Sequence, residues 1–129
     1  MYIRFVSARR HRHCAAEEGI FQAMRRVRLN GQPEWLRRDY WLTRHRVEQL
    51  AVPCVLTDRG RHRWAAQNLC WLKPEAEWYL GELRYLAWIM SEAGVPVREI
   101  RTRRPGAIFW EDPHQIVAKP ERRQVPKAF

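Results

Sequence analysis

Lysine is scarce in this chain of 129 residues, which has only Lys73, Lys119 and Lys127 against 21 arginines. Codon usage in a GC-rich genome is one explanation of that skew. It does not explain the formal net charge of +10, because acidic residues could have balanced it. Residues 1–64 carry 14 basic and 6 acidic side chains, and residues 65–129 carry 10 and 8, so the excess lies in the first half. A field of this sign favours acidic or polyanionic partners.

Cysteine is also scarce, and its few positions do not form a motif. Cys14, Cys54 and Cys70 are odd in number and lack a C-x-x-C spacing, which argues against a disulfide framework. We therefore expect reduced, mostly buried thiols that behave as small apolar side chains, as in a reducing compartment.

Long apolar runs are missing as well. No run approaches the ~18 residues that a membrane helix needs, and Arg4, Arg9, Arg10 and Arg12 surround the short apolar start too closely for a secretory signal. We expect a cytoplasmic protein without a membrane segment.

Aromatic residues, by contrast, are abundant, with seven Trp, four Tyr and four Phe. This composition argues against disorder of the whole chain, and the length suits one domain with one core. We predict a single domain over residues 1–120 and a loose basic tail over residues 121–129.

Hydrophobic periodicity and turn residues predict an alternation of strands and helices. The predicted strands span residues 2–6, 68–72, 97–102, 107–110 and 116–118, the predicted helices span residues 14–29, 33–50 and 74–93, and a basic loop spans residues 7–13. The order β-α-α-β-α-β-β-β predicts an α+β two-layer fold, with helices on one face of a small, mixed, mostly antiparallel sheet. Residues 69–102 suit a right-handed crossover between parallel strands.

The stretch from Val95 to Pro120 carries the strongest fold signal. Pro105-Gly106 suits the central positions of a type II turn, and Asp112-Pro113 suits the first two positions of a type I turn. The strand between them, residues 107–110, is apolar on both parities, which predicts an inner strand with protein on both faces. Together these features predict a C-terminal meander of three strands.

Several segments near the two ends of the chain form a recurring combination. They are Ile3-Arg4-Phe5-Val6, Cys70-Trp71-Leu72-Lys73-Pro74-Glu75-Ala76, Gly94-Val95-Pro96-Val97-Arg98, Arg101-Thr102-Arg103-Arg104-Pro105-Gly106, and Glu111-Asp112 with Gln115-Ile116-Val117-Ala118. The combination resembles a family of short uncharacterised bacterial proteins. The chain departs from the family at Leu72 (phenylalanine in the family) and Trp110 (tyrosine), and residues 7–66 match poorly. The resemblance implies a small single-domain bacterial protein and carries no activity with it.

Arginine clusters are the first candidate site. They fall in predicted loops and at a hairpin tip: Arg9, Arg10 and Arg12; Arg61 and Arg63 with Trp64; and Arg101, Arg103 and Arg104. Guanidinium groups bind phosphate in a bidentate way, and Trp64 with His11, His13 and His62 could stack on bases. No helix-turn-helix, RRM or KH signature accompanies them, so a solvated basic surface is the alternative. We predict a binding module that contacts nucleic acid, another polyanion or an acidic protein surface.

A catalytic alternative rests on Glu111, Asp112 and His114, which lie close enough in sequence for acid–base or metal chemistry. Turn formation also explains Asp112, and a cross-strand ion pair with Arg101 or Arg103 would explain Glu111. We therefore assign no catalytic residue, while keeping an enzyme as a further alternative.

A metal site is not predicted. Zinc sites normally show close ligand pairs at both ends, whereas this chain has one such end among its candidate ligands His11, His13, Cys14, Cys54, His62 and Cys70. We expect neither a metal nor a cofactor.

Aromatic residues on the predicted helices give the last alternative. Trp35, Trp41, Trp78, Tyr85 and Trp88 exceed what one small core needs, and Trp, Tyr and Arg are the residues that anchor interfaces. A protein–protein interaction is therefore the competing function, as a homodimer, an accessory subunit or an inhibitor that docks on an acidic or nucleic-acid-binding partner.

Overall fold

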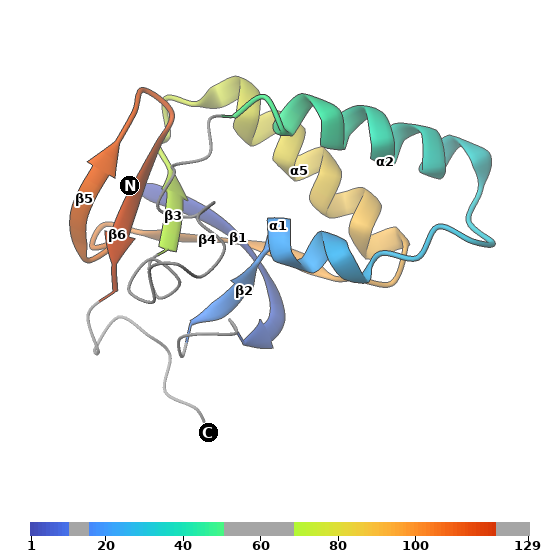
Figure 1. The fold of residues 1–129 in the computed structure, drawn as a ribbon, viewed down its shortest axis with the longest axis horizontal. Coiled ribbons are helices and arrows are strands. Elements are labelled where there is room, and N and C mark those ends of the chain that lie inside the picture. The colour runs from blue at the N-terminus through green and yellow to red at the C-terminus, as the bar shows by residue number, and fades with distance from the viewer. Residues whose placement is uncertain (11–15, 51–68, 121–129) are drawn as a thin grey trace, which may run out of the picture.

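A computed structural model describes residues 1–10, 16–50 and 69–120 (Figure 1). The elements in chain order are β1 (Tyr2–Arg10), β2 (Glu17–Gly19), α1 (Ile20–Ala23), the 3-10 turn η1 (Met24–Arg26), α2 (Glu34–Val47), β3 (Leu69–Leu72), α5 (Glu77–Glu92), β4 (Val97–Thr102), β5 (Ala107–Glu111) and β6 (Gln115–Lys119). Helices and a mostly antiparallel sheet confirm the predicted α+β class. The predicted tail, residues 121–129, lies outside the described residues.

The sheet is organised around β1, which pairs antiparallel with three other strands. On one side it pairs with β4 from Tyr2↔Thr102 to Ser7↔Val97. On the other side it meets β3 through Ile3↔Leu72 and β2 through Arg10↔Glu17. Beyond β3 the sheet continues through β6 to β5, again antiparallel (Figure 1).

One predicted connection is wrong and another is confirmed in part. The C-terminal meander fails because β4 pairs with β1 and only β5 and β6 form a hairpin. The crossover predicted over residues 69–102 does join two strands that run in one direction, since β3 and β4 are both antiparallel to β1, which lies between them. The physical reason is that β1 is apolar on both parities, with Ile3, Phe5 and Val6 all buried, and therefore suits a central position.

The region after residue 6 also differs from its prediction. Residues 7–10 extend β1 instead of forming a loop, and residues 17–19 form β2 where the helix 14–29 was expected. The predicted helix over residues 14–29 was partly right, because α1 and η1 form within it and bury Ile20 and Met24. Pairing with β1 overrides the helical pattern of residues 17–19, since strand formation depends on what lies alongside.

The two long helices are confirmed, with shorter bounds than predicted. α5 ends at Glu92 and is followed by Gly94, whose φ of 90° lies in the region that favours glycine. The Gly94 N–H donates to the Ser91 carbonyl, and the Val95 N–H donates to the Met90 carbonyl at 2.8 Å. This Schellman pattern satisfies the last carbonyls of α5 and turns the chain into β4.

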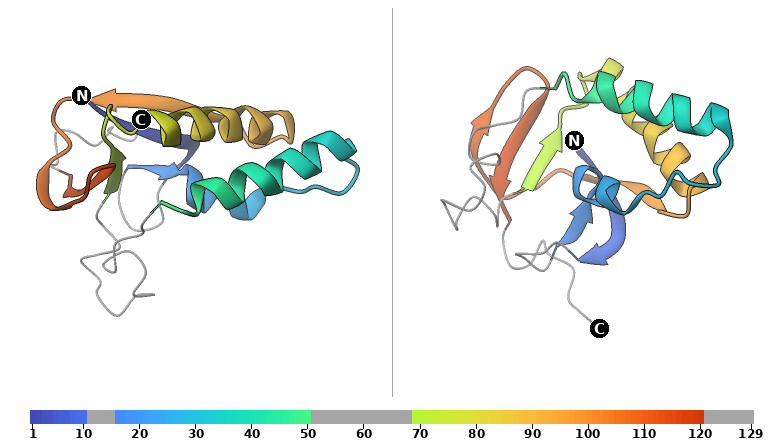
Figure 2. Two further views of the ribbon diagram at one scale, coloured as in Figure 1. Left: turned by 90° about the horizontal axis from the view of Figure 1, so that it is seen from above. Right: turned by 45° about the vertical axis from the view of Figure 1, so that its right-hand side comes forward.

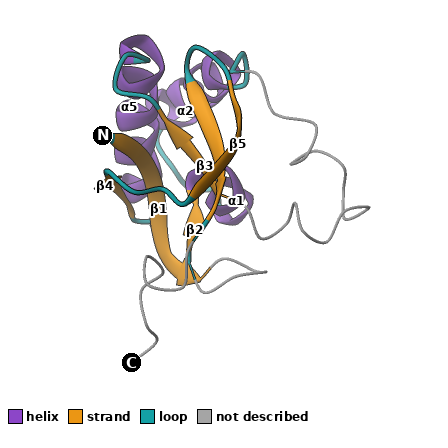
Figure 3. Ribbon diagram, turned by 90° about the vertical axis from the view of Figure 1, so that its left-hand side faces the viewer, coloured by secondary structure: helices purple, strands orange, loops and turns teal. Residues whose placement is uncertain are grey.

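The main core lies between the helices and the sheet. Its fully buried members include Leu36 and Tyr40 of α2 and Leu83 and Leu86 of α5, packed with Phe5 of β1. Figures 2 and 3 show α2 and α5 side by side on the same face of the sheet, as predicted. A smaller buried cluster comprises Ala16, Leu69, Trp71, Ile116 and Ala118.

Gly106, which was predicted for a type II turn, lies in the β4–β5 connection, and the strand that follows it differs from its prediction. Gly106 has a φ of 110°, and a Cβ at this position would lie 2.0 Å from the Lys119 carbonyl oxygen, so only glycine fits. The predicted inner strand is instead the edge strand β5, with Ile108 and Phe109 each 43% exposed. The prediction failed because a short apolar run has the same sequence pattern in an inner strand as in an edge strand.

Candidate interaction surfaces

The predicted arginine clusters do not gather where the structure describes them. Arg101 lies opposite Ile3 in the β1–β4 register, and Arg103 and Arg104 follow in the β4–β5 connection. Arg9 lies six residues beyond Ile3 on β1, which is about 20 Å along the strand. The exposed Arg9 and the exposed Arg103–Arg104 pair therefore lie towards opposite ends of β1.

Among the remaining predicted site residues, Arg10 belongs to β1 and follows Arg9 there. Arg12, Arg61, Arg63 and Trp64 lie outside the described residues, as do the histidines that were expected to stack on bases, His11, His13 and His62.

Ion pairs engage several arginines of the described part. Arg84 and Arg101 both contact Glu99, at 2.7 Å and 2.8 Å. The Arg84 hydrogen bond and then the Arg101 hydrogen bond hold the pKa of Glu99 below its usual value, against partial burial. Arg101 is thus held by an ion pair on its own strand, although it is exposed, as Arg103 and Arg104 are.

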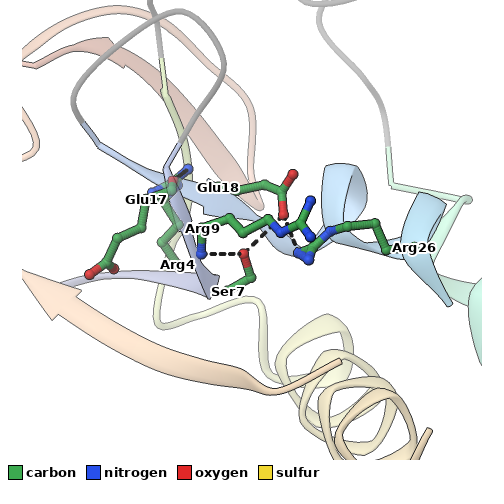
Figure 4. Close-up of polar contacts among 6 residues, drawn as sticks. All are labelled: Arg4, Ser7, Arg9, Glu17, Glu18 and Arg26. Atoms are coloured by element: carbon green, nitrogen blue, oxygen red, sulfur yellow. Dashed lines mark hydrogen bonds and ion pairs between the residues drawn. The ribbon is translucent and has the colours of Figure 1, made fainter. Parts of the chain in front are cut away.

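A second polar network joins β1 to β2 and η1 (Figure 4). The buried Arg4 guanidinium donates to the Glu17 carbonyl at 2.6 Å. The Ser7 hydroxyl donates to Glu18 at 2.9 Å, and Arg26 pairs with the same carboxylate at 2.5 Å. These contacts join β1 to β2 and β2 to η1, so Arg4 and Arg26 stabilise the packing of these three elements.

The hairpin acids have structural roles. Glu111 pairs at 2.6 Å with Lys73, whose pKa it raises, and not with Arg101 or Arg103 as expected. The reason is that β5 lies next to β6 and not next to β4, and β6 pairs in turn with β3, which Lys73 directly follows. Asp112 Oδ1 accepts the N–H groups of His114 and Gln115 at 2.7 and 2.8 Å, which stabilises the turn.

The described cysteine, Cys70, is a half-buried free thiol. Cys70 Sγ donates to Gln115 Oε1 at 2.8 Å, and burial followed by the charge of Asp112 raises its pKa to about 12. Cys70 therefore stays protonated at neutral pH and lacks the thiolate that nucleophiles and metal ligands need. Within residues 1–10, 16–50 and 69–120, no three His, Cys, Asp or Glu side chains come together as metal ligands.

Aromatic rings, unlike the arginines, gather across α2 and α5. Trp35 stacks on Trp88 with centroids 5.7 Å apart and planes at 27°, and Tyr85 stacks on Trp88 at 5.9 Å and 17°. All three keep 38–49% of their surface exposed. We call Trp35, Tyr85 and Trp88 the aromatic ladder. Also exposed on these helices are Trp41, Leu42 and Trp78.

Hydrogen bonding holds the ladder in place. The Tyr85 hydroxyl donates to Asp39 on α2, which also pairs with Arg38 at 3.3 Å. This hydrogen bond lowers the pKa of Asp39 and raises the pKa of Tyr85. Arg46 of α2 also approaches Glu82 of α5, at 3.6 Å. Polar contacts between α2 and α5 therefore hold together the two helices that carry the ladder.

The ladder lies on helices without net charge. α2 carries four arginines and two acids, and α5 carries one arginine and three acids, so their charges of +2 and −2 cancel. The excess of positive charge in the chain therefore lies elsewhere.

Sequence reasoning named the ladder residues singly but did not bring them together. The available signal was the i, i+3 spacing of Tyr85 and Trp88 on one helix. Nothing local could reveal that Trp35, some fifty residues away, completes the stack, or that Asp39 anchors it.

In comparisons with known proteins, no family model, curated protein or solved structure matches the chain. The resemblance to a bacterial family stays a prediction. None of the described helices is long and apolar enough to cross a membrane.

Proposed function

We propose that this protein is a protein–protein interaction module and that the aromatic ladder is its contact surface. The observation that carries the proposal is the stack of Trp35, Trp88 and Tyr85, exposed and fixed across two helices. Trp and Tyr dominate the binding energy of interfaces because large rings bury much area with few rotatable bonds.

The size of the effect supports a binding role. An aromatic side chain buries about 200 Å² when fully covered, and each ladder ring has roughly 40% still exposed. Covering that remainder corresponds to about 80 Å² and about 2 kcal/mol per ring, before the costs of association.

Electrostatics favour a protein partner over nucleic acid at this surface. Nucleic-acid affinity comes largely from cations that neutralise phosphates, whereas the positive and negative charges of α2 and α5 cancel. Asp39 also lies at the ladder itself, where a phosphate would meet a negative charge.

Affinity capture with matched variants tests the proposal. The tagged chain, Trp88→Ala and Trp41→Ala are compared for retained partners from a lysate of the source organism. Trp41 is a suitable control because it is 55% exposed on α2 and packs with Arg44 and Tyr40 outside the ladder. We expect a partner that wild type and Trp41→Ala retain and Trp88→Ala loses. Equal retention by all three chains, or no retained partner, would contradict the proposal.

A second candidate function is polyanion binding, with nucleic acid as the first ligand to test. The net charge of +10 favours it, and so does a local basic group in which Arg103 and Arg104 precede β5 and Lys119 lies opposite Ala107. Of the other predicted arginines, Arg9 and Arg10 belong to β1, and Arg12, Arg61 and Arg63 lie outside the described residues.

Fluorescence polarisation with DNA and RNA oligonucleotides at 50 and 200 mM salt tests this second function. Binding through several phosphates should weaken by about 10³-fold or more between these concentrations. Arg103→Glu should weaken binding further, while Trp88→Ala should leave it unchanged. Absence of binding at the lower salt concentration would remove this candidate. A cytoplasmic location, which either function would suit, stays a prediction.

A further inference from the structure

The helix α5 carries large apolar side chains on two opposite faces. Its inner face, which includes Leu83 and Leu86, is buried in the main core. Its outer face carries Trp78, Tyr85 and Trp88, which are 38–55% exposed. A surface helix of a globular protein normally has one apolar stripe, which faces its own core. The outer stripe of α5 therefore has the composition of a face that packs against another molecule.

Gly81 completes this outer stripe. The positions 78, 81, 85 and 88 are three, four and three residues apart, which is the spacing with which one helix packs on another. Gly81 is exposed, and no atom of the described residues lies within 4 Å of the position that a Cβ would take. Glycine inside a helix costs about 1 kcal/mol relative to alanine, and no packing in the described part of the chain explains it here. The stripe is shallow at Gly81, which leaves room for the backbone of a neighbouring helix.

The helix α2 adds apolar surface along the seam between the two helices. α2 runs antiparallel to α5, because Trp35 meets Trp88 whereas Arg46 meets Glu82, six residues earlier on α5 (Figure 1). Leu42 lies four residues before Arg46 on the same side of α2, and it is 49% exposed. Apolar side chains from both helices therefore line the seam.

The exposed apolar area along the seam matches what a stable dimer needs. Its members are Trp35, Leu42, Trp78, Tyr85 and Trp88, each 38–55% exposed. A large side chain offers about 200 Å², so together they leave about 450 Å² of apolar surface exposed on each copy. A standard interface buries about 800 Å² per partner, of which about 57–65% is apolar. That share is about 450–520 Å².

The charges of the two helices make this surface complementary to itself. α2 carries a net charge of +2 and α5 carries −2. A twofold axis that runs along the seam lays α2 of each copy over α5 of the other, so a basic helix meets an acidic helix twice. A twofold axis across the helices would set α2 on α2 and α5 on α5, with like charges together.

We propose that the seam between α2 and α5 binds a second copy of this chain, with α2 of each copy over α5 of the other. This inference rests on the proposed function and names its partner. Because the axis runs along the helices, residues that are level with each other in one copy stay level between the copies. Trp35 is thus level with Trp88 of the other copy, and Arg46 with Glu82. The twofold contact is closed, so assembly stops at a dimer.

Sedimentation velocity of the full chain from about 0.1 µM to about 100 µM tests the proposal, since interfaces of this size bind with micromolar or tighter affinity. We expect wild type to shift from monomer to dimer. Leu42→Lys sets two cations near the twofold axis and should weaken the dimer at least tenfold. Ile108→Lys is the matched control, because it adds the same charge at a similarly exposed apolar side chain on β5 and should dimerise like wild type. A wild-type chain that is monomeric throughout, or equal dimerisation of Leu42→Lys and wild type, would overturn the proposal.

Gly81→Gln provides a second test, in which the fold of the monomer is not at risk. The new side chain has open space within the described part of its own chain, and glutamine favours a helix more than glycine does. The monomer should therefore be at least as stable to urea as wild type, while the dimer should be weakened about tenfold or more because the shallow part of the stripe is filled. A dimer of wild-type affinity in Gly81→Gln would contradict the proposed packing.

The identity of the captured partner separates this inference from the proposed function. Mass spectrometry of the protein that the tagged chain retains from the lysate should identify the untagged chain itself, and Trp88→Ala should lose it. A monomeric chain that retains a different protein through Trp88 would refute the second copy as the partner and would keep the interaction function. A monomeric chain that retains no partner would remove both.

Discussion

The helix layer and the β5–β6 hairpin both expose large apolar side chains, but they present them differently. On α2 and α5 the rings stack on one another, and the net charge of the two helices is zero. On β5 the apolar residues lie at the end of the described sheet, on a strand that pairs there with β6 alone. A ring surface suits a partner that covers it with side chains, whereas a strand edge suits another strand. Exposed apolar area alone therefore does not define the kind of partner.

Glycine-to-alanine substitutions should change the free energy of unfolding in opposite directions in the two regions. This is the largest stability difference that we expect. Gly106→Ala meets both a positive φ and the Lys119 carbonyl at 2.0 Å, and should cost about 3 kcal/mol or more. Gly81→Ala lies on α5 with no atom within 4 Å of its new Cβ, and should gain about 0.5–1 kcal/mol. Urea denaturation of both variants measures the difference. If Gly106→Ala left the free energy of unfolding unchanged, the backbone around Gly106 and Lys119 would have to move apart without cost.

Within the helix layer, burial should separate stability from binding. Leu83 of α5 is fully buried, so Leu83→Ala should cost about 3 kcal/mol. Trp88→Ala removes a ring that is 49% exposed, and should cost about 1 kcal/mol, mainly through lost stacking. Thermal and urea unfolding compare the two variants. Equal costs would show that the ladder supports the fold and would weaken its assignment as a contact surface.

The smallest expected effect concerns the anchor of the ladder. Asp39 has a lowered pKa, chiefly because it accepts the Tyr85 hydroxyl, so Tyr85→Phe should raise that pKa back towards its usual value. A lowered pKa stabilises the folded state above the unfolded pKa of Asp, and this stabilisation is lost as the pH falls through the folded value. NMR titration of the Asp39 carboxyl carbon in both proteins measures the change. An unchanged pKa would assign the shift to the next contributors, Arg38 and Arg46.

The raised pKa of Tyr85 acts at the other end of the pH scale. Because the protonated phenol is favoured in the folded state, its contribution is present below the unfolded pKa of Tyr and is lost as the pH rises through the folded value. Ultraviolet titration of wild type against Tyr85→Phe should reveal one phenol that ionises above the usual range. A difference spectrum that titrates at the ordinary pKa would contradict the Asp39–Tyr85 contact.

Features that depend on neighbouring residues were predictable from the sequence. The positive φ of Gly106, the carboxylate of Asp112 that accepts the N–H groups of the next turn, and the cap of α5 at Gly94 all follow from local backbone preferences. The buried faces of α2 and α5 follow from helical periodicity in the same way, as Leu36 and Leu83 illustrate.

Features that depend on residues far apart in the chain were not predictable from the sequence. Three residues in β2, Glu17–Gly19, became a strand because β1 lay beside them. The apolar pattern of β5 did not reveal whether one strand or two would flank it. The arginine clusters looked alike in sequence, but the β1–β4 register separates Arg9 from Arg103 by much of the length of β1.

The sequence by itself thus determined the class of fold, the order of the long elements and the chemistry of the turns, because short-range sterics and periodicity decide them. Only the tertiary structure decided that β1 would be the central strand, that β5 would be an edge, and that Trp35 would meet Trp88. The physical reason is that such pairings depend on closing long loops and on competition between many apolar segments for the same partners. Both candidate interaction surfaces are products of that second kind of information.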